Sequence, residues 1–314
     1  MANYLVTGGG GFIGSNIVRE LLDRGDSVRV IDDFSTGRRE NLTEVADRIE
    51  LIEGDICDPD AIRKATADMD YVLHQAAAPS VPRSVDAPIE SLTVGVLGTA
   101  QTLLAARDAK VKRVVYAASS SAYGDQEGDY KSESMLPKPL SPYAAAKLSG
   151  EHLCPVFTIC YGLETIVLRY FNVFGPRQDP ASEYSAVIPL FITAVLEGRQ
   201  PVFYGDGCQT RDFTYVANNV EANLLAARSD KGAGMTFNIA CGESYSLRQL
   251  LAAINQAAGT NFEAIEKPPR VGDVRHSMAD VSLAREALGY EVSVPFEEGV
   301  RRTVEWYRGQ LGGG

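Results

Sequence analysis

The amino-acid sequence predicts an α/β fold built around a mainly parallel sheet. Short apolar runs of strand length alternate with amphipathic helical patterns along the 314 residues, an order typical of a parallel sheet covered by helices. The first run, 3–7, leads through a glycine turn into an amphipathic helix at 12–24, which is the order of a dinucleotide-binding unit. We therefore expect a Rossmann-type doubly wound parallel sheet with a smaller C-terminal α/β domain for the substrate.

The glycine turn after Thr7 carries the first functional prediction. Gly8, Gly11 and Gly14 have the spacing Gly-x-x-Gly-x-x-Gly. A turn of glycines lets the backbone approach a pyrophosphate, and the helix that starts at Phe12 and Ile13 offers free N–H groups and a favourable dipole. We expect Gly8, Gly11, Phe12 and Ile13 to bind a dinucleotide.

Two acidic residues end the second predicted strand, 27–31. At this place a carboxylate accepts both ribose hydroxyls of NAD and repels a 2′-phosphate. Asp32 and Asp33 are the candidates, and the polar loop that follows them is expected to cover the adenine side through Ser35, Thr36 and Gly37.

The next two strands, 49–53 and 71–74, end where an open α/β sheet places its ligand contacts. The residues expected to face the cofactor there are Asp55, Ile56, Gln75, Ala76 and Ala77. For Asp55 a solvated loop is an equally good interpretation, because acidic residues after strands are common. His74 is interpreted as a hydrogen-bonded histidine of the sheet, since nothing nearby in the sequence orients it as a base.

A long helix at 89–108 precedes the fifth strand, 113–118. Gly95 and Gly98 lower its intrinsic stability, so they indicate close packing or a ligand nearby. The strand runs into Ser119, Ser120 and Ser121. These hydroxyls suit a substrate hydroxyl, although a serine-rich turn explains them equally well.

A helix predicted to begin after Ser141 places a tyrosine and a lysine one helical turn apart. Ser141 is a predicted N-cap and Pro142 a first helical residue. Tyr143 and Lys147, four residues apart, then share a face. An ammonium beside a phenol favours the phenolate, so we expect Lys147 to lower the pKa of Tyr143 and make it a general base.

Composition narrows the possible partners. The formal net charge of −11 and the absence of a Lys/Arg cluster argue against nucleic acid and anionic membranes. Five cysteines and three histidines show no metal-ligand spacing, so we expect no metal and reduced thiols. We find no signal peptide and no apolar run that approaches membrane-spanning length, and we expect a soluble, cytoplasmic protein.

Together these residues resemble the extended short-chain dehydrogenase/reductase family, and within it the nucleotide-sugar 4-epimerases. The resemblance covers essentially the whole chain. Its motifs are Thr7 to Gly14, Asp32, Gly54-Asp55, the serine cluster, Tyr143-x-x-x-Lys147, Arg169 to Pro176, Gly205-Asp206-Gly207, Arg211-Asp212 and Arg270-x-Gly272-Asp273.

The resemblance implies a catalytic set of Ser119, Tyr143 and Lys147 with NAD as cofactor. It also implies that Tyr143, Lys147 and Tyr170 contact NAD. Arg211 and Arg270 are implied to bind the diphosphate, because a planar guanidinium group matches phosphate oxygens. The substrate-binding residues implied for a UDP-sugar are Ser80, Ser84, Ser119, Ser120, Ser121, Tyr143, Asn172, Ala186, Val187, Ile188, Tyr204, Arg211, Arg270, Asp273 and Ser277.

The identity of the reaction depends on Ser121. Related dehydratases and decarboxylases carry a Glu at this place, whereas a serine leaves the 4-keto sugar no elimination partner and favours its rotation and return of the hydride. In the resembling epimerases a small residue at the position of Ser277 leaves room for an N-acetyl group on the sugar. The resemblance therefore implies interconversion of UDP-GlcNAc and UDP-GalNAc, with UDP-Glc and UDP-Gal also accepted. A lyase and a non-catalytic sensor of NAD or nucleotide sugars are the alternatives.

The resemblance also bears on domain organisation and assembly. We expect an NAD-binding domain at 1–174, rejoined by 212–240, and a UDP-sugar domain at 175–314. The helices at 89–108 and 141–161 are expected to form a homodimer interface. One departure from the family pattern is Gly95, where relatives often carry Asn in Asn-Val-x-Gly-Thr.

Overall fold

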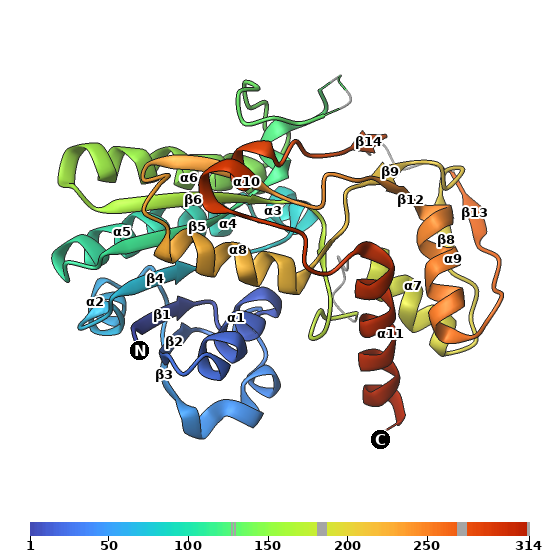
Figure 1. The fold of residues 1–314 in the computed structure, drawn as a ribbon, viewed down its shortest axis with the longest axis horizontal. Coiled ribbons are helices and arrows are strands. Elements are labelled where there is room, and N and C mark those ends of the chain that lie inside the picture. The colour runs from blue at the N-terminus through green and yellow to red at the C-terminus, as the bar shows by residue number, and fades with distance from the viewer. Residues whose placement is uncertain (127, 129, 181–186, 269–274, 313–314) are drawn as a thin grey trace.

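A seven-stranded parallel sheet forms the centre of the larger lobe (Figure 1). The structure is a computed structural model and describes residues 1–126, 128, 130–180, 187–268 and 275–312. The strand order is β11-β6-β5-β4-β1-β2-β3, and every pair in it is parallel. The predicted Rossmann-type sheet is therefore confirmed. Its strands are β1 Asn3–Thr7, β2 Ser27–Asp32, β3 Ile49–Glu53, β4 Tyr71–His74, β5 Arg113–Ser119, β6 Glu164–Tyr170 and β11 Met235–Ile239.

The central strands are apolar throughout because both faces of the sheet are buried. In β1, Tyr4 and Val6 enter the core cluster that packs on one face, while Leu5 enters the cluster on the other face. Successive side chains of a strand point to opposite sides, so one apolar run supplies both cores. The strand bounds follow directly from these runs.

Helices cover both faces of the sheet. One layer contains α1 Phe12–Asp23 and α8 Val216–Arg228, which contact each other. The other layer contains α2 Pro59–Thr66, α4 Pro88–Leu92, α5 Thr99–Asp108 and α6 Pro142–Tyr161, with the short α3 Val81–Asp86 beside them. Short 3₁₀ segments lie at Arg39–Asn41, Thr43–Arg48 and Ser120–Tyr123.

Helix α6 begins where the sequence predicts. Ser141 is its N-cap, and the Ser141 hydroxyl accepts a hydrogen bond from the Ala144 N–H at 3.1 Å. Pro142 occupies the first helical position, and Gly162 ends the helix in the left-handed conformation with φ of 71°. The cap therefore fixes the helical register of Tyr143, two residues along.

The long helix predicted at 89–108 is interrupted by a π-helical segment, Thr93–Gly98, between α4 and α5. The expectation that no apolar run approaches membrane-spanning length is wrong: by length and composition, Pro88–Asp108 could cross a membrane. In the fold this helix packs against α2 and α6. Its apolar character has a packing role there, because Gly95 and Gly98 lie close to Ala146 and Ile56.

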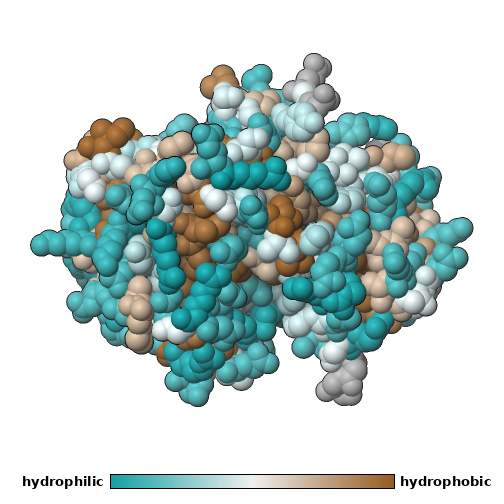
Figure 2. All heavy atoms as spheres, viewed as in Figure 1, coloured by the Kyte–Doolittle hydropathy of each residue, from teal (hydrophilic) through white to brown (hydrophobic). Residues whose placement is uncertain are grey.

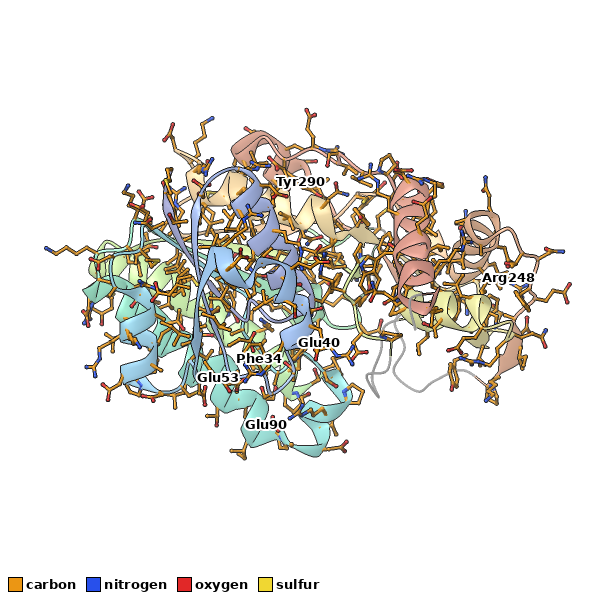
Figure 3. All side chains as sticks on the ribbon, turned by 90° about the horizontal axis from the view of Figure 1, so that it is seen from below. Phe34, Glu40, Glu53, Glu90, Arg248 and Tyr290 are labelled. Carbon is orange, nitrogen blue, oxygen red and sulfur yellow. The ribbon has the colours of Figure 1, made fainter. Side chains whose placement is uncertain are left out.

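The smaller lobe lies beside the carboxyl ends of the strands (Figure 1). Figure 2 shows a mainly hydrophilic surface that is indented at the lower edge between the two lobes, and Figure 3 places Arg248 in the smaller lobe, far from Phe34 and Glu53 in the larger one. The helices of the smaller lobe are α7 Val187–Leu196, α9 Leu247–Ala258 and α11 Phe296–Gly312. Helix α10 Ser282–Leu288 lies near β11 of the large sheet. The remaining strands are β7 Val173–Phe174, β8 Val202–Tyr204, β9 Thr210–Arg211, β10 Thr214–Tyr215, β12 Tyr245–Ser246, β13 Ile265–Lys267 and β14 His276–Ser277.

The chain crosses between the lobes more than once. After β8 and β9 it returns through α8 and adds β11 at the edge of the large sheet beside β6. It then enters the smaller lobe again through α9. The boundaries at 174 and 212–240 stay predictions, but a chain with this path cannot be divided by a single cut.

Candidate active site

The glycine turn is packed so closely that side chains do not fit. Gly8 has φ of +69°, and a Cβ there would lie 2.8 Å from Ala76 Cα. A Cβ on Gly14 would lie 2.2 Å from the Gly8 carbonyl oxygen. Helix α1 begins at Phe12, and its N-cap Gly11 has no side chain to cap it, so among the described residues no cap accepts the first N–H groups, including those of Phe12 and Ile13. This backbone suits a pyrophosphate.

Asp32 lies against the turn at the end of β2. One of its carboxylate oxygens accepts the Gly10 N–H and the other accepts the Phe34 N–H, both at 2.8 Å. Burial raises the pKa of this carboxyl group, and the two backbone hydrogen bonds oppose that rise. Since each oxygen of a carboxylate has two acceptor positions, one remains on each for a ribose hydroxyl.

The neighbouring predicted contacts differ in how they are held. Asp33 accepts hydrogen bonds from the Ser35 N–H and hydroxyl, so it orders the loop that continues through Thr36. A Cβ on Gly37 would lie 2.8 Å from an Asp32 oxygen, which places Gly37 beside the carboxylate. Asp55 accepts the Cys57 N–H at 2.8 Å, a local turn, while Ile56 is buried.

Gln75 and Tyr170 belong to a closed ring of hydrogen bonds with Asn223 of α8. The Tyr170 hydroxyl donates to Gln75 Oε1 at 3.2 Å, Gln75 Nε2 donates to Asn223 Oδ1 at 3.0 Å, and Asn223 Nδ2 donates to the Tyr170 oxygen at 2.7 Å. Asn223 is missing from the sequence predictions. Its signal was a polar residue with an asparagine four positions earlier, Asn219, in a largely apolar helix.

His74 is buried in a directional chain of hydrogen bonds. Thr99 Oγ1 donates to the Gly95 carbonyl at 2.8 Å and lies 3.1 Å from His74 Nε2. The Nε2 atom therefore carries the proton, and Nδ1 accepts from Thr7 Oγ1 at 2.6 Å. Thr7 Oγ1 in turn accepts the Ala76 N–H at 3.2 Å. The interpretation of His74 as a hydrogen-bonded histidine of the sheet is confirmed.

Ser119 and Ser121 form a second directional pair. Ser121 donates to Ser119 Oγ through its hydroxyl at 2.9 Å and through its N–H at 3.2 Å. With both acceptor positions of Ser119 used, its own proton is free to be donated. Burial raises the pKa of the Tyr143 phenol, and the Ser119 hydroxyl opposes this rise.

The prediction that Lys147 lowers the pKa of Tyr143 is wrong for this structure. The net effect of the surroundings is to raise the pKa of Tyr143. Lys147 Nζ donates instead to the Ala117 carbonyl of β5 at 2.7 Å and lies over the Tyr116 ring. Burial lowers the pKa of Lys147 to about 8. A shared helix face brings the two residues near each other, but the long lysine side chain turns into the sheet.

The packing around Gly95 explains why this chain has a glycine where relatives often carry Asn. A Cβ at this position would lie 2.7 Å from Ala146 Cβ, so an Asn requires the π-helical segment to move away from α6. Ala146 directly precedes Lys147. The close contact of Gly95 with Ala146 therefore holds the helix that carries the tyrosine and the lysine.

A cavity of about 240 Å³ is lined by residues of β7, α7, β9 and α9 and of the segments next to them. Predicted substrate residues Asn172, Val187, Ile188 and Arg211 all line it. The sequence predictions did not include the other lining residues, Val173, Phe174, Gln209, Phe213 and Leu247. Four of these five residues are apolar, and apolar residues that line a ligand cavity have the same sequence pattern as core residues, so no sequence signal separates the two.

The remaining predicted substrate residues are placed as follows. Ser277 lies directly across from Arg211 in the pair of β14 and β9. Ser80 caps α3 by accepting the Arg83 N–H, and the buried Ser84 donates to the Val81 carbonyl. Ser120 begins the 3₁₀ turn after β5, and Tyr204 ends β8. Ala186, Arg270 and Asp273 lie outside the described residues.

Within the described part of the chain, no group of three or more His, Cys, Asp or Glu side chains is arranged to hold a metal ion. The five cysteines are not joined in disulfides. The charged side chains of the described site include the Asp32 carboxylate, the Lys147 amine and the Arg211 guanidinium.

Comparison with known proteins decides the family. Residues 4–240 match the model of the NAD dependent epimerase/dehydratase family. The chain belongs to this family. Its cofactor is NAD, and the glycine turn with Asp32 fits that group, because a Cβ would fill the cradle and the carboxylate keeps acceptor positions free.

Individual relatives of the family cover nearly the whole chain. A UDP-glucose 4-epimerase of Mycolicibacterium smegmatis is 42% identical over 308 residues, which are 97% of this chain and 98% of the relative. The structure of a UDP-N-acetylglucosamine 4-epimerase of Methanobrevibacter ruminantium, in complex with UDP-N-acetylmuramic acid, has 40% identity, covers 98% of this chain and 99% of its own, and superposes with a TM-score of 0.94. The structure of a Thermus thermophilus UDP-glucose 4-epimerase in complex with NAD is 39% identical, covers 98% of this chain and 99% of its own, and superposes with a TM-score of 0.88.

The family also includes lyases. Relatives named as dehydratases and decarboxylases match this chain at 32% to 34% identity. Family membership therefore does not by itself select the reaction, and the side chains near Tyr143 have to do so.

Proposed function

We propose that this protein is an NAD-dependent 4-epimerase of UDP-hexoses, with UDP-GlcNAc and UDP-GalNAc as its main pair and UDP-Glc and UDP-Gal also accepted. The observation that carries the proposal is the hydrogen-bonded pair of Ser121 and Ser119 at the end of β5, whose Ser119 hydroxyl acts on the Tyr143 phenol of α6. The epimerase relatives at about 40% identity support it.

In this proposal Tyr143 is the general base and Ser119 the group that orients the sugar. NAD, when bound, supplies the acceptor and later the donor of hydride at sugar carbon 4. Ser119 donates its proton to the phenol oxygen or to the sugar 4-oxygen, since Ser121 occupies both of its acceptor positions. Burial raises the pKa of the Tyr143 phenol and the Ser119 hydroxyl opposes the rise, so Ser119 favours the phenolate. As the phenolate, Tyr143 takes the proton of the 4-hydroxyl, and it gives the proton back at the end of the cycle.

Ser121 argues for an epimerase over a lyase. A lyase must move a further proton or leaving group, and in the resembling lyases a Glu two places before Tyr-Gly does this. Here Ser121 is fixed on Ser119 by two hydrogen bonds and has no carboxylate to offer. The 4-keto sugar is then reduced again in the same site, on its other face.

Turnover without added cofactor tests the proposal. Purified protein, once denatured, is expected to release NAD(H), which is measured by fluorescence. Native protein is expected to convert UDP-GlcNAc into UDP-GalNAc, which is measured by chromatography, with no nucleotide added. A 4-keto-6-deoxy product or carbon dioxide would instead identify a lyase, and binding of UDP-hexoses without any turnover would identify a sensor.

The substrate range depends on Ser277 in this proposal. Ser277 pairs with Arg211, which lines the cavity. A larger side chain at position 277 would therefore narrow the cavity on the side of Arg211. We expect Ser277→Tyr to lower kcat/KM for UDP-GlcNAc at least about tenfold while kcat/KM for UDP-Glc changes less than about threefold. Rates on both substrates are compared side by side.

Ser277→Ala is the matched control, because it keeps the residue small and should keep both activities. If Ser277→Tyr turns over UDP-GlcNAc as fast as the wild type does, Ser277 does not gate the N-acetyl group. The epimerase proposal itself survives that result, since it depends on Tyr143 and Ser119.

We further propose a cytoplasmic homodimer that joins α5 and α6 of one copy to those of a second. Large apolar side chains are exposed on this layer, among them Ile89 at 74% and Ile159 at 83%. Leu97, Leu104 and Val156 of the segments 89–108 and 141–161 are also exposed. Exposed apolar patches of this kind mark interaction sites, and light scattering of the wild type gives the mass.

A further inference from the structure

Asp212 is a buried carboxylate just outside the cavity, and its oxygens hold two separate loops. The residue is fully buried and directly follows Arg211 of β9. Its Oδ1 accepts the Cys241 N–H at 2.9 Å. Its Oδ2 accepts the Gly242 N–H at 3.0 Å and the Ala279 N–H at 3.2 Å. Two backbone segments, at 241–242 and at 279, therefore meet at one side chain.

The backbone of Asp212 adds two further bonds, and both go to predicted substrate residues. Its N–H donates to the Ser277 carbonyl at 2.8 Å. Its carbonyl accepts Asn172 Nδ2 at 2.9 Å. Asn172 lines the cavity next to Arg211, and Ser277 lies across from Arg211 in the ladder. Asp212 thus touches both sides of the cavity wall without lining it.

The ends of the Ser277 segment are fixed in the same way. The Ala279 N–H, two residues beyond Ser277, is bound by the carboxylate. On its other side this segment pairs with Lys131, which donates its N–H to the Met278 carbonyl at 2.8 Å and accepts the Asp280 N–H at 3.0 Å. The 277–280 segment is therefore clamped between Asp212 and the loop at Lys131.

Asp212 is an ionisable side chain that is fully buried, which is costly for a residue with a purely structural role. Burial raises its pKa to about 6, the charge of Glu243 acts in the same direction, and the three backbone hydrogen bonds oppose the rise. At neutral pH the carboxylate is still ionised, at a cost relative to a neutral group of the same shape. A buried charge that touches the wall of the cavity points to a requirement of the site.

We propose that Asp212 is a positioning residue for the UDP-sugar: it sets the separation between the Arg211 and Ser277 strands and the place of the Asn172 amide, and so controls how tightly the cavity holds the uridine diphosphate portion of the substrate. The inference rests on the proposed UDP-sugar epimerase function and deepens it. Asp212 acts through Asn172, Arg211 and Ser277, and no proton of the reaction passes through it.

Asp212→Asn tests this role with almost no change in volume. An amide cannot accept on both sides, so at least one of the three N–H groups loses its acceptor. We expect KM for UDP-GlcNAc and UDP-Glc, and Kd for UDP by calorimetry, to rise about tenfold, while kcat changes less than about threefold and bound NAD is retained. A role in general stability would not produce this split.

Asn255→Asp is the matched control, because it exchanges amide and acid in the opposite sense at another buried clamp. Asn255 accepts from the Thr260 hydroxyl and the Phe262 N–H and donates to the Phe262 carbonyl. Its loop follows α9, away from the residues that line the cavity. We expect a lower melting temperature with KM and the Kd for UDP unchanged.

Hydrogen exchange of the wild-type protein tests the inference without a variant. Saturating UDP is expected to slow exchange at least about threefold in segments 240–243 and 277–280, whose N–H groups the carboxylate holds. The inference is overturned if UDP leaves both segments unchanged, if Asp212→Asn keeps KM and Kd within twofold, or if it loses kcat and bound NAD together with affinity. Absence of wild-type turnover would remove the epimerase proposal alone, since binding of UDP still reports on Asp212.

Discussion

Replacing Tyr143 with Phe is expected to lower kcat for UDP-hexose epimerisation about 10²- to 10⁴-fold, the usual share of a positioned general base. The phenol oxygen is the group in contact with Ser119, and Phe removes it without disturbing the ring. KM is expected to change little, because the cavity residues stay in place. Initial rates with UDP-Glc and UDP-GlcNAc measure both constants.

Tyr4→Phe is the control for the loss of a buried tyrosine hydroxyl. Tyr4 lies at the opposite end of β1 from the glycine turn, and its hydroxyl accepts Arg228 Nε at 2.8 Å. This variant should lose some stability and keep kcat. Full epimerase activity of Tyr143→Phe would contradict the assignment of Tyr143 as the general base.

Acid is expected to unfold the protein partly through His74. Burial, with a smaller contribution from the Lys147 charge, lowers the pKa of His74 from 6.5 to about 3. The unfolded chain takes up a proton below pH 6.5 that the folded chain refuses, so stability is complete above pH 6.5 and falls as the pH is lowered toward 3. At about 1.36 kcal/mol for each pH unit, this single residue accounts for a loss of about 5 kcal/mol.

Urea unfolding at a series of pH values measures this contribution. His74→Gln should be less stable than the wild type at pH 7, because the chain from Thr7 to Thr99 is broken. The difference in free energy of unfolding should narrow as the pH falls, because glutamine does not titrate and the variant loses no stability through this position. His152→Gln changes an exposed histidine and should run parallel to the wild type. Parallel curves for His74→Gln would show that His74 does not couple folding to pH.

The larger lobe could be predicted from sequence almost element by element. Its strands are short apolar runs bounded by polar residues, and β1, β3 and β4 have the predicted bounds. The helix at Tyr143 starts where a serine and a proline signal a start. Such features depend on residues close together in the sequence, so the sequence contains them directly.

Parts of the site could be predicted because a motif fixes its own backbone. The glycine spacing leaves only a close turn, and Asp32 follows from its place at the end of the next strand. The cavity residues Asn172, Val187, Ile188 and Arg211 were expected from family resemblance. Without that resemblance they read as ordinary loop and helix residues.

The sequence by itself determined the sheet, the dinucleotide turn, and Tyr143 and Lys147 on one helix face, since each depends on spacing within a few residues. Tertiary structure decided where the polar groups point. It turned Lys147 toward Ala117, closed the ring of Gln75, Tyr170 and Asn223, and set Asp212 between loops at Cys241 and Ala279. These bonds join residues that are far apart in the chain, and only packing of the sheet and its helices brings their atoms within reach.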